Sequence, residues 1–398
     1  MTEVASTGNP SGSSKHIGIV IEMGQPFSHH HGSYKGIVDY VREHHPDWTT
    51  TVDPFLTGLL DETGNVRYDG IVGRITQPVA DLAEKHGIPI INHWMNSPAE
   101  SLPAVFSDYR ASGRIVANHF LDHGYHRIGL VSWEWDRARP LFHAGIEQAV
   151  QERGGEVFAM NVPYLFEDNP KDFVEFSRLI TEMLKGASTP MGLFVPMDAM
   201  ALYTMQTCQQ LGLRVPNDVG LAVYYNSIDL CLNTHPTMTS IEANDELIGY
   251  ESMRLLDLQL AGESLSQDLP MRIPPKTLRV RGSSEVFVSE DPIVSKAMHY
   301  IGEHSREGIT VDEVAEAAHV SVRTLSRRFN KFVGRSVLGE INRVRTQAIK
   351  QVLVDTEIPL HEVATTCGFT STSHFNVFFR KATDQTPGSY RKQHRRQS

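Results

Sequence analysis

The sequence predicts a two-lobed α/β part followed by an all-α domain with two helix-turn-helix motifs. Three observations predict this fold class. Short apolar runs alternate with helical patterns from residue 16 onward, the last quarter of the chain holds an imperfect internal repeat, and the net charge changes sign near residue 285. We therefore divide the chain into a disordered tail (1–14), an α/β part (15–284) and a helical C-terminal domain (285–398).

The composition is that of a water-soluble globular protein. The 398 residues are 40% hydrophobic and 21% charged, and no apolar run approaches the roughly 20 residues that span a bilayer. The first residues contain no apolar core of a secretory signal, so we expect a cytoplasmic protein. Cys208, Cys231 and Cys367 are odd in number and widely spaced, which argues against disulfides and against a zinc site.

Six short, β-branched apolar runs predict strands that are buried on both faces of a parallel sheet. These runs are residues 16–22, 69–75, 88–94, 126–132, 191–196 and 219–225. Apolar residues at three- and four-residue spacing predict helices at 111–123, 142–153, 173–185 and 200–211. Because about 265 residues of such alternation is long for one lobe, we expect two lobes with a ligand cleft between them.

An internal repeat organises the C-terminal domain. A Pro- and Ser-rich stretch (262–284) ends the α/β part, and the chain then contains two related segments, 311–332 and 360–382. They share Glu-Val-Ala at an offset of 49, and Phe329 with Phe379 at an offset of 50. Each copy has the pattern of a short amphipathic helix, a tight turn and a second helix with polar residues outward, which predicts a helix-turn-helix.

Small residues mark the turns of both copies. Ser321 is placed to cap the second helix of the first copy, and Thr370 or Ser371 to cap that of the second copy. Gly368 permits the turn in the second copy. Between the copies, an apolar stripe predicts a connecting helix that holds the two units at a fixed distance, and it consists of Ile341, Val344, Ala348 and Val352.

The net charge of −10 is unevenly distributed. Residues 285–398 carry a net charge of +3 and the preceding residues −13. Within the C-terminal domain, residues 321–350 hold eight basic side chains and one acid, Glu340. A concentrated basic patch on an acidic protein favours nucleic acid as a partner, although a solvated helix face gives the same pattern.

The second copy of the repeat resembles the signature of the AraC/XylS transcription regulators. The resemblance rests on residues 358–392, with Gly368-Phe369 at the turn, a Phe-rich helix at 375–379 and the ending Thr386-Pro387-Gly388-Ser389-Tyr390-Arg391. It covers about the last quarter of the chain. It implies that the C-terminal domain binds a DNA operator and regulates transcription.

The α/β part resembles the periplasmic-binding-protein-like sensors of LacI/GalR regulators. The segments that carry this resemblance are 122–132 and 136–149. It implies a sugar effector, with D-xylose as the best candidate and another pentose, a hexose or a sugar acid as the alternative. Dimerisation through the sensor also follows from the family resemblance, since the sequence contains no coiled coil.

In DNA recognition, a helix that enters the major groove needs long donors near its N-terminus, and Arg pairs with the two acceptors of guanine. The predicted base-reading residues of the first unit are Arg323, Thr324, Ser326 and Arg327, and its predicted phosphate contacts are Arg328, Lys331, Arg335, Arg343 and Arg345. The predicted DNA-binding residues of the second, less basic unit are Thr372, Ser373, His374, Asn376 and Arg380. Val377 is placed to contact a thymine methyl group or nothing at all.

Ligands of such α/β lobes sit outside the carboxyl ends of parallel strands, so the candidate contacts are the residues that follow each predicted strand, including Phe27 to His31. Carboxylates, Arg and Asn hydrogen-bond sugar hydroxyls, and Trp stacks on a sugar ring. The predicted ligand-binding residues are Arg139, Asp198, Asn226, Trp135, Asp108, Arg74 and His31. The LacI/GalR resemblance singles out Arg139 and Asp198. Tyr225-Asn226, where related sensors commonly have an Asp, makes the predicted pocket less anionic.

Other functions have weaker support in the sequence. His29-His30-His31 could suggest a metal, but three consecutive residues on a regular element cannot all face one ion, so we predict no metal and no cofactor. No glycine-rich phosphate loop and no G-x-S-x-G elbow is present, which argues against an enzyme. A solute-binding protein does not fit the absent export signal, and an architectural nucleoid protein does not fit the acidic α/β part.

These observations lead to one functional hypothesis. We expect a sequence-specific DNA-binding regulator of sugar-catabolic genes, an activator that responds to a small sugar bound between the lobes of the sensor. Its expected partners are double-stranded DNA, the sugar, a second copy of the chain in a homodimer, and RNA polymerase. No membrane partner is expected.

Overall fold

The structure is a computed structural model that describes residues 14–23, 28–163, 170–265, 268–285, 288–289, 291–304 and 306–395. It divides into two compact units, of which the first comprises residues 1–108 and 243–275 and the second comprises residues 109–242 and 276–398. We call the first unit lobe 1, and the α/β portion of the second unit (109–242 and 276–284) lobe 2. The predicted tail at 1–14 and the predicted ligand residue Phe27 lie outside the described residues, apart from Ser14.

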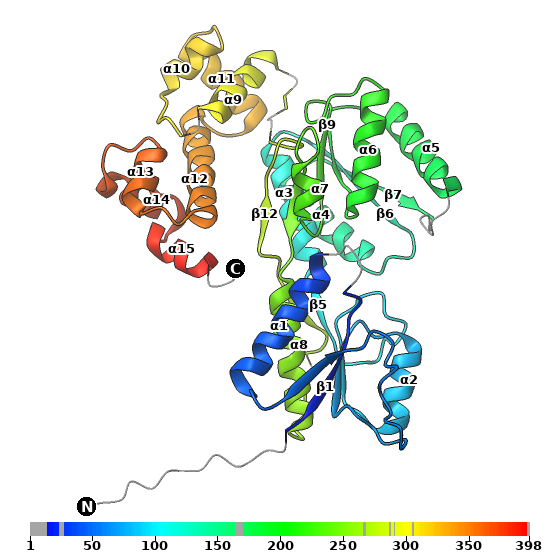
Figure 1. Ribbon diagram of the computed structural model, residues 1–398. Helices are drawn as coiled ribbons and strands as arrows, with labels where there is room; N and C mark the ends of the chain where they lie inside the picture. Colours follow the sequence, from blue (N-terminus) through cyan, green and yellow to red (C-terminus); the bar gives the residue numbers. More distant parts are fainter. Residues whose placement is uncertain are drawn as a thin grey trace, which may run out of the picture. The chain divides into compact units, whose positions relative to one another are not determined.

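Lobe 1 is built on a four-stranded parallel sheet with the order β2-β1-β3-β4. The strands are β1 (His16–Val20), β2 (Thr49–Val52), β3 (Gly70–Gly73) and β4 (Ile90–Asn92), and the helices are α1 (Ser28–His44), α2 (Gln77–His86) and α8 (Asp245–Leu260). Helices α1 and α8 cover one face of the sheet and α2 the other (Figure 1). Ile17 and Ile19 are fully buried towards the first pair of helices, and Val20 and Ile71 towards α2, so successive strand residues feed two cores. A small parallel pair, β5 (Val105–Ser107) and β11 (Met271–Ile273), completes the lobe.

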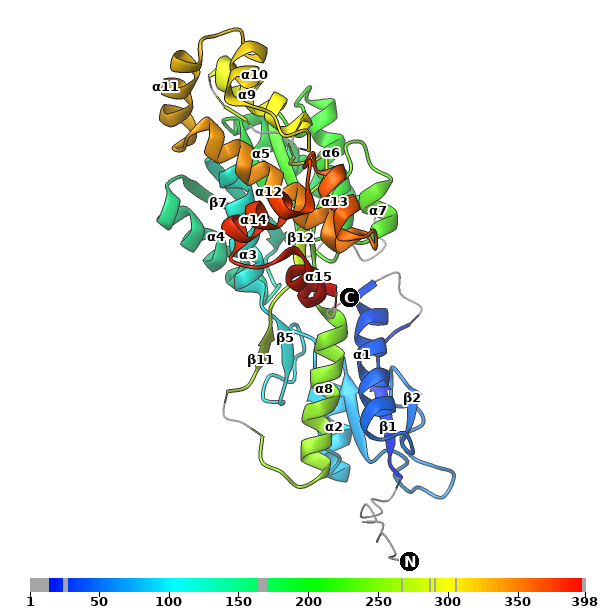
Figure 2. The same cartoon turned by 90° about the vertical axis from the view of Figure 1, so that its left-hand side faces the viewer.

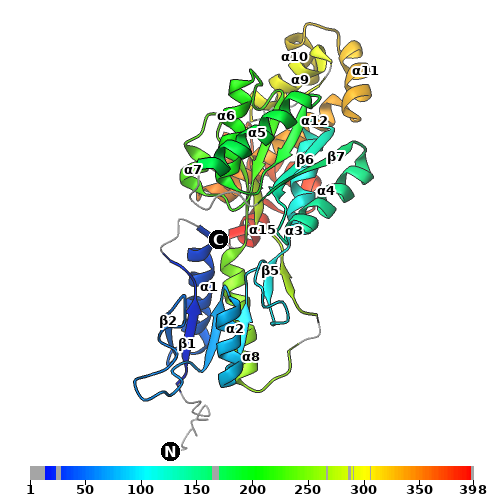
Figure 3. The same ribbon diagram turned by 90° about the vertical axis from the view of Figure 1, so that its right-hand side faces the viewer.

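Lobe 2 has a six-stranded sheet with the order β12-β10-β9-β8-β6-β7, in which β12 is antiparallel to β10 and the other pairs are parallel. Its strands are β6 (Arg127–Trp133), β7 (Glu156–Val162), β8 (Met191–Phe194), β9 (Val219–Val223), β10 (Thr239–Glu242) and β12 (Thr277–Arg279). Its helices are α3 (Tyr109–Asp122), α4 (Arg139–Arg153), α5 (Pro170–Gly186), α6 (Asp198–Gln210) and α7 (Ile228–Leu232). Helices α3 and α4 lie on one face and α5 and α6 on the other (Figure 3).

The predicted fold class is confirmed, and the predicted elements are present. All six predicted strands and all four predicted helices of the α/β part occur within a few residues of their expected positions. The sequence pattern missed the helices α1, α2, α7 and α8, of which α1 and α8 pack against each other in lobe 1. It also missed the edge or short strands β2, β5, β7, β10, β11 and β12. His29 to His31, which follow the first predicted strand, belong to the first turn of α1.

The C-terminal domain is entirely helical where the structure describes it. Its helices are α9 (Pro292–Glu303), α10 (Val311–Ala317), α11 (Val322–Val333), α12 (Val337–Asp355), α13 (Leu360–Thr366), α14 (Thr372–Thr383) and α15 (Pro387–Arg395). Helices α10 and α11 form the first helix-turn-helix unit, and α13 and α14 form the second. Helix α12 runs between them (Figure 2).

The predicted connecting helix is confirmed as α12, and its two halves belong to two separate cores. Ile341, in the first half, packs with Leu325 and Phe329 of the first unit. Ile349 and Val352, in the second half, pack with the core of the second unit around Phe375 and Phe379. Each unit therefore has its own apolar core, and α12 is shared by both.

Candidate DNA-reading helices and effector-binding residues

The second helix of the first unit, α11, presents a polar face to solvent. Ser321 caps it, since the Ser321 hydroxyl accepts a hydrogen bond from the Thr324 amide at 3.3 Å. Leu325 and Phe329 are fully buried. On the outer side Arg323 and Arg327 are exposed, while Thr324 and Ser326 are half-buried. The four predicted base-reading residues thus lie away from the core, at the N-terminal end of the helix.

The predicted phosphate contacts of the first unit differ in their surroundings. Lys331 is exposed and lies 4.8 Å from the ring centre of Phe332. Arg328 donates from Nη1 to Asp291 Oδ2 at 2.5 Å. Asp291 also caps α9 through the amides of Ile293 and Val294. Arg328 therefore ties α11 to the start of α9, which competes with a phosphate contact, and Lys331 remains placed for one.

The second helix of the second unit, α14, is capped in the same way. Of the two predicted caps it is Ser371 that accepts from the His374 amide, at 3.2 Å. Phe375 and Phe379 are fully buried and belong to the core of the second unit. The remaining predicted contacts face outward, with Thr372 half-buried and Ser373, His374, Asn376 and Arg380 exposed. Val377 is also exposed on this surface.

The turns of the two units use the same left-handed conformation with different residues. Gly368 has a φ of 70°, as its predicted role requires, and His319 occupies the corresponding position of the first unit with a φ of 57°. The turn between α13 and α14 is one residue longer than the turn between α10 and α11. This extra residue explains why the sequence offset between the copies changes from 49 to 50.

Arg345 was predicted to contact phosphate, but its guanidinium is occupied within the domain. It donates to the carbonyl oxygens of Cys367, at 2.8 Å, and Gly368, at 2.9 Å. It also stacks on Phe369, with its central carbon 3.8 Å from the ring centre. Arg345 thus fastens the turn of the second unit to α12, which argues against a phosphate contact.

The carboxyl edge of the lobe 1 sheet gathers a basic and aromatic cluster. Arg74 follows β3, and its Nη1 lies 2.8 Å from His30 Nε2. Its Cζ lies 4.8 Å from the ring centre of Trp94, which follows β4. Burial lowers the pKa of His93 to about 3, and burial together with His30 and Arg74 holds the pKa of His29 well below its usual value. These imidazoles are therefore neutral near pH 7, and Arg74 supplies the positive charge.

Lobe 2 has a different set of polar groups at the carboxyl edge of its sheet. Ser132 Oγ, at the end of β6, Arg139 Nε, at the start of α4, and Asp198 Oδ1, at the start of α6, are buried atoms without a hydrogen-bond partner among the described residues. Strands β6 and β8 are neighbours in the sheet, so Ser132 near the end of β6 and Asp198 after β8 belong to adjacent strand ends. Burial raises the pKa of Asp198 to about 6. Buried polar atoms in proteins are normally paired, so each of these three atoms is a candidate to hydrogen-bond a polar ligand.

Two tryptophans lie at the same carboxyl edge of the lobe 2 sheet, at the end of β6 and just after it. Trp133 and Trp135 stack with ring centres 5.5 Å apart and planes inclined by 17°. Trp135 is 41% exposed. Arg139 donates from Nη1 to Asn161 Oδ1, at the end of β7, at 2.9 Å, which orients the guanidinium. This combination of a flat apolar face with Asp and Arg groups suits a sugar.

The other predicted ligand residues, Asn226, Asp108 and His31, lie in different surroundings. Asn226 Oδ1 accepts from Arg281 at 2.7 Å, and the Asn226 amide donates to Ser240. Asp108 is half-buried in lobe 1, where its amide donates to Ile273. His31 is exposed, whereas His29 and His30 belong to the cluster around Arg74. His31 therefore lies outside that cluster, and its contact with a ligand stays a prediction.

Sequence reasoning did not single out Ser132 or Asn161. Asn161 lies in β7, a strand that the sequence pattern missed, and Ser132 lies inside the run that predicted β6. The short apolar run at 157–160 is the signal that could have identified β7. Among the described residues no group of three or more His, Cys, Asp or Glu side chains could hold a metal ion. No described helix is long and apolar enough to cross a membrane.

Comparisons with known proteins assign both parts of the chain. Residues 314–393 match a helix-turn-helix domain family, and residues 117–284 match a periplasmic binding protein-like domain family. The xylose operon regulatory protein of Escherichia coli is 25% identical over 372 residues, which cover 90% of this chain and 92% of that protein. The corresponding protein of Haemophilus influenzae is 24% identical over 367 residues, 90% of this chain and 93% of that protein.

A solved structure shows the same fold over nearly the whole length. The xylose-binding transcription activator XylR matches with a TM-score of 0.59 at 21% identity, covering 96% of this chain and 98% of that chain. The relatives are transcription regulators and not enzymes, in agreement with the sequence analysis. This chain therefore combines a periplasmic binding protein-like domain with a C-terminal helix-turn-helix domain, in the same order as the xylose regulators to which it is similar.

Proposed function

We propose that this regulator activates transcription in response to a small sugar, with D-xylose as the first candidate. The observation that carries the proposal is the set of buried polar atoms of Ser132, Arg139 and Asp198, which lack partners among the described residues and lie at the same edge of the lobe 2 sheet as the stacked Trp133 and Trp135. A sugar would supply hydroxyls to these atoms and a C–H face to the indoles. The names of the relatives, which are xylose regulators, support the choice of sugar.

A sugar acid is the second candidate effector. Arg74 is the charged group of the lobe 1 cluster, and the histidines around it have pKa values lowered by burial. A guanidinium that faces neutral imidazoles can pair with a carboxylate of the ligand in the bidentate geometry that Arg favours. The two candidates differ in charge, so a panel that contains both neutral and acidic sugars separates them.

In this proposal the effector changes DNA binding by preferring one arrangement of the sensor. A ligand shifts such an equilibrium only by the ratio of its affinities for the two arrangements. The C-terminal domains of a homodimer would then engage repeated DNA sites, each domain using α11 and α14, and would recruit RNA polymerase.

The first experiment is a thermal-shift screen of the full chain against pentoses, hexoses and sugar acids. A ligand that binds the folded state raises the midpoint by mass action. We expect a selective shift with D-xylose that is lost in Arg139→Ala and retained in Asp218→Asn, whose carboxylate pairs with Arg214 at the surface of lobe 2. If another sugar raises the midpoint and D-xylose does not, that sugar becomes the candidate effector. If no sugar of the panel raises the midpoint, the proposal of a sugar sensor is contradicted.

The titration of Asp198 sharpens this experiment. Burial raises the pKa of Asp198 to about 6, whereas the pKa of an Asp in an unfolded chain is about 3.9. The native state therefore binds this proton more tightly, and the free protein loses stability as the pH rises from about 4 to 6. A sugar hydroxyl donates to the ionised carboxylate, so the affinity for the sugar should fall as the pH drops below about 6. Asp198→Asn should remove both pH dependences.

A further inference from the structure

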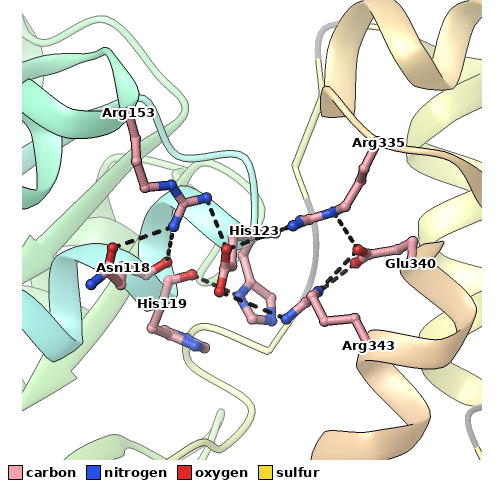
Figure 4. A network of polar contacts seen from close by, with 8 residues as sticks. Asn118, His119, His123, Arg153, Arg335, Glu340 and Arg343 are labelled. Carbon is pink, nitrogen blue, oxygen red and sulfur yellow. Dashed lines mark hydrogen bonds and ion pairs between the residues drawn. The ribbon is translucent and has the colours of Figure 1, made fainter. Parts of the chain in front are cut away.

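An acidic residue of lobe 2 is contacted by arginines from the C-terminal domain. Asp122, the last residue of α3, pairs with Arg153 of the same lobe at 2.8 Å. Arg335 lies with Nη1 3.8 Å from Asp122 Oδ1 and donates from Nη2 to the Asp122 carbonyl at 3.2 Å. Arg343, on α12, lies with Nη1 3.8 Å from Asp122 Oδ2. Figure 4 shows Arg153 on one side of the cluster and Arg335 and Arg343 on the other.

A buried carboxylate holds the two arginines in place. Glu340 on α12 is 0% exposed. It pairs with Arg335 Nε at 2.6 Å and accepts two hydrogen bonds from Arg343, at 2.7 and 2.9 Å. A buried carboxylate is costly unless cations accompany it, so Glu340 requires these arginines. The single negative charge of Glu340 balances only one of the two positive charges of Arg335 and Arg343. Asp122 faces the remaining positive charge.

Neutral contacts surround the ionic cluster. The Val288 amide donates to the His123 carbonyl at 2.8 Å, and His119 Nε2 lies 2.7 Å from Ser284 Oγ at the end of lobe 2. Burial lowers the pKa of His123 to about 4 and that of His119 well below its usual value, and Arg343 lowers both further. These imidazoles are neutral near pH 7, so they add no charge that would repel Arg343.

Helix α3 connects this cluster to the place where the chain enters the second unit. The helix begins at Tyr109, the first residue of that unit, and ends at Asp122. Its fourteen residues span about 21 Å as a rigid α-helix. A change in how the chain leaves lobe 1 at Asp108 would thus be transmitted along α3 to the arginines.

We propose that Asp122, Glu340, Arg335 and Arg343 form the joint through which the sensor controls the first helix-turn-helix unit. The inference rests on the proposed function, because it assigns the route of an effector response. In this assignment Arg335 and Arg343 are positioning residues that dock α12 on lobe 2. It replaces their predicted role as phosphate contacts, since a phosphate would have to displace Asp122 and lie close to Glu340.

The test compares Asp122→Asn with Asp218→Asn in the full chain. Asp122→Asn keeps the shape of the side chain and removes the charge that faces Arg335 and Arg343, whereas Asp218→Asn removes a lobe 2 carboxylate that pairs with Arg214. The readout is the ratio of DNA dissociation constants without and with D-xylose, on DNA selected from a random pool. We expect the ratio of Asp122→Asn to fall at least about threefold towards one and the ratio of the control to stay at the wild-type value. A wild-type ratio in Asp122→Asn overturns the proposal.

Two further measurements distinguish the joint from a phosphate contact and from a wrong choice of effector. In Arg343→Gln a phosphate contact would lower the salt dependence of DNA binding by about one unit of slope, whereas the joint leaves the slope unchanged and lowers the ratio. If D-xylose has no effect on the wild type, the proposed effector is wrong, and amide exchange then tests the joint. Faster exchange of the Val288 amide in Asp122→Asn than in the control supports the docking contact, and equal exchange contradicts it.

Discussion

The two helix-turn-helix units share one plan but differ in charge and in what holds them. Both have a serine cap, a left-handed turn and two buried side chains that pack with α12. These side chains are Leu325 and Phe329 in the first unit and Phe375 and Phe379 in the second. The first unit carries Arg323 and Arg327 on its outer face and is followed by Arg335 and Arg343, which pair with Asp122 of lobe 2. The second unit offers hydroxyl, imidazole and amide groups and is fastened to α12 through Arg345.

The difference indicates a division of labour within the C-terminal domain. Basic side chains near a sensor can serve either DNA or the sensor, and the carboxylate partners distinguish the two uses. Arg323 and Arg327 remain exposed for DNA, whereas Arg335 and Arg343 share Glu340 and Asp122. The first unit thus combines the stronger predicted readout with the contact to lobe 2, and the second unit adds weaker contacts at a distance that α12 fixes.

The largest expected effect comes from the equivalent phenylalanines. Phe329→Ala and Phe379→Ala each remove a fully buried ring, which costs about 3–5 kcal/mol. Because the two units have separate cores, amide exchange should accelerate in α10 and α11 in the first variant and in α13 and α14 in the second. Equal acceleration of amide exchange in both units in either variant would show that the two units unfold together, which would contradict their separate cores.

The turns provide the second contrast. In Gly368→Ala the new Cβ would lie 2.4 Å from the Arg306 carbonyl oxygen, at a φ of 70°. We expect a loss of about 1–3 kcal/mol in the stability of the second unit. His319→Ala starts from a residue that already has a side chain at positive φ, so its effect should stay below about 1 kcal/mol. Amide exchange of the two units measures both, and equal costs would contradict the unequal packing of the turns.

The third contrast concerns base recognition. Arg327→Ala should weaken binding to selected DNA by about 1–2 kcal/mol and relax the preference at one base position. Asn376→Ala should have a smaller effect at a different position, since α14 lacks an arginine at its N-terminal end. Lys331→Ala is the matched control, because loss of a phosphate contact weakens all sequences alike. The check is selection of bound sequences from a random pool, and an unchanged preference in Arg327→Ala would remove α11 as the reading helix.

Local patterns in the sequence were sufficient for much of this structure. Alternating apolar runs located the six main strands, and Ser321, Ser371 and Gly368 marked both units, since caps and turns depend on neighbouring residues. The pairing of α1 with α8 could not be predicted, because it joins segments about 200 residues apart. The same holds for Asp122 with Arg343. Glu340 was visible as one acid in a basic stretch, but its burial depends on packing that the sequence does not display.

The residues that follow strands gave a partial view of the candidate effector-binding groups. Arg139 and Asp198 carry buried polar atoms that lack partners among the described residues, which is consistent with their predicted role. His31 proved exposed while its neighbours His29 and His30 joined the Arg74 cluster, because the helical phase of α1 decides which side chain turns inward.

Coupling between the sensor and the DNA-binding domain is tested most directly by titrating the full chain with DNA selected from a random pool, followed by fluorescence anisotropy with and without D-xylose. A regulator whose sensor and DNA-binding domain are coupled should change its dissociation constant for DNA at least about fivefold when the sugar is added. The change should vanish in Arg139→Ala, whose DNA binding without sugar stays at the wild-type value. The same dissociation constant with and without every sugar of the panel would contradict this coupling.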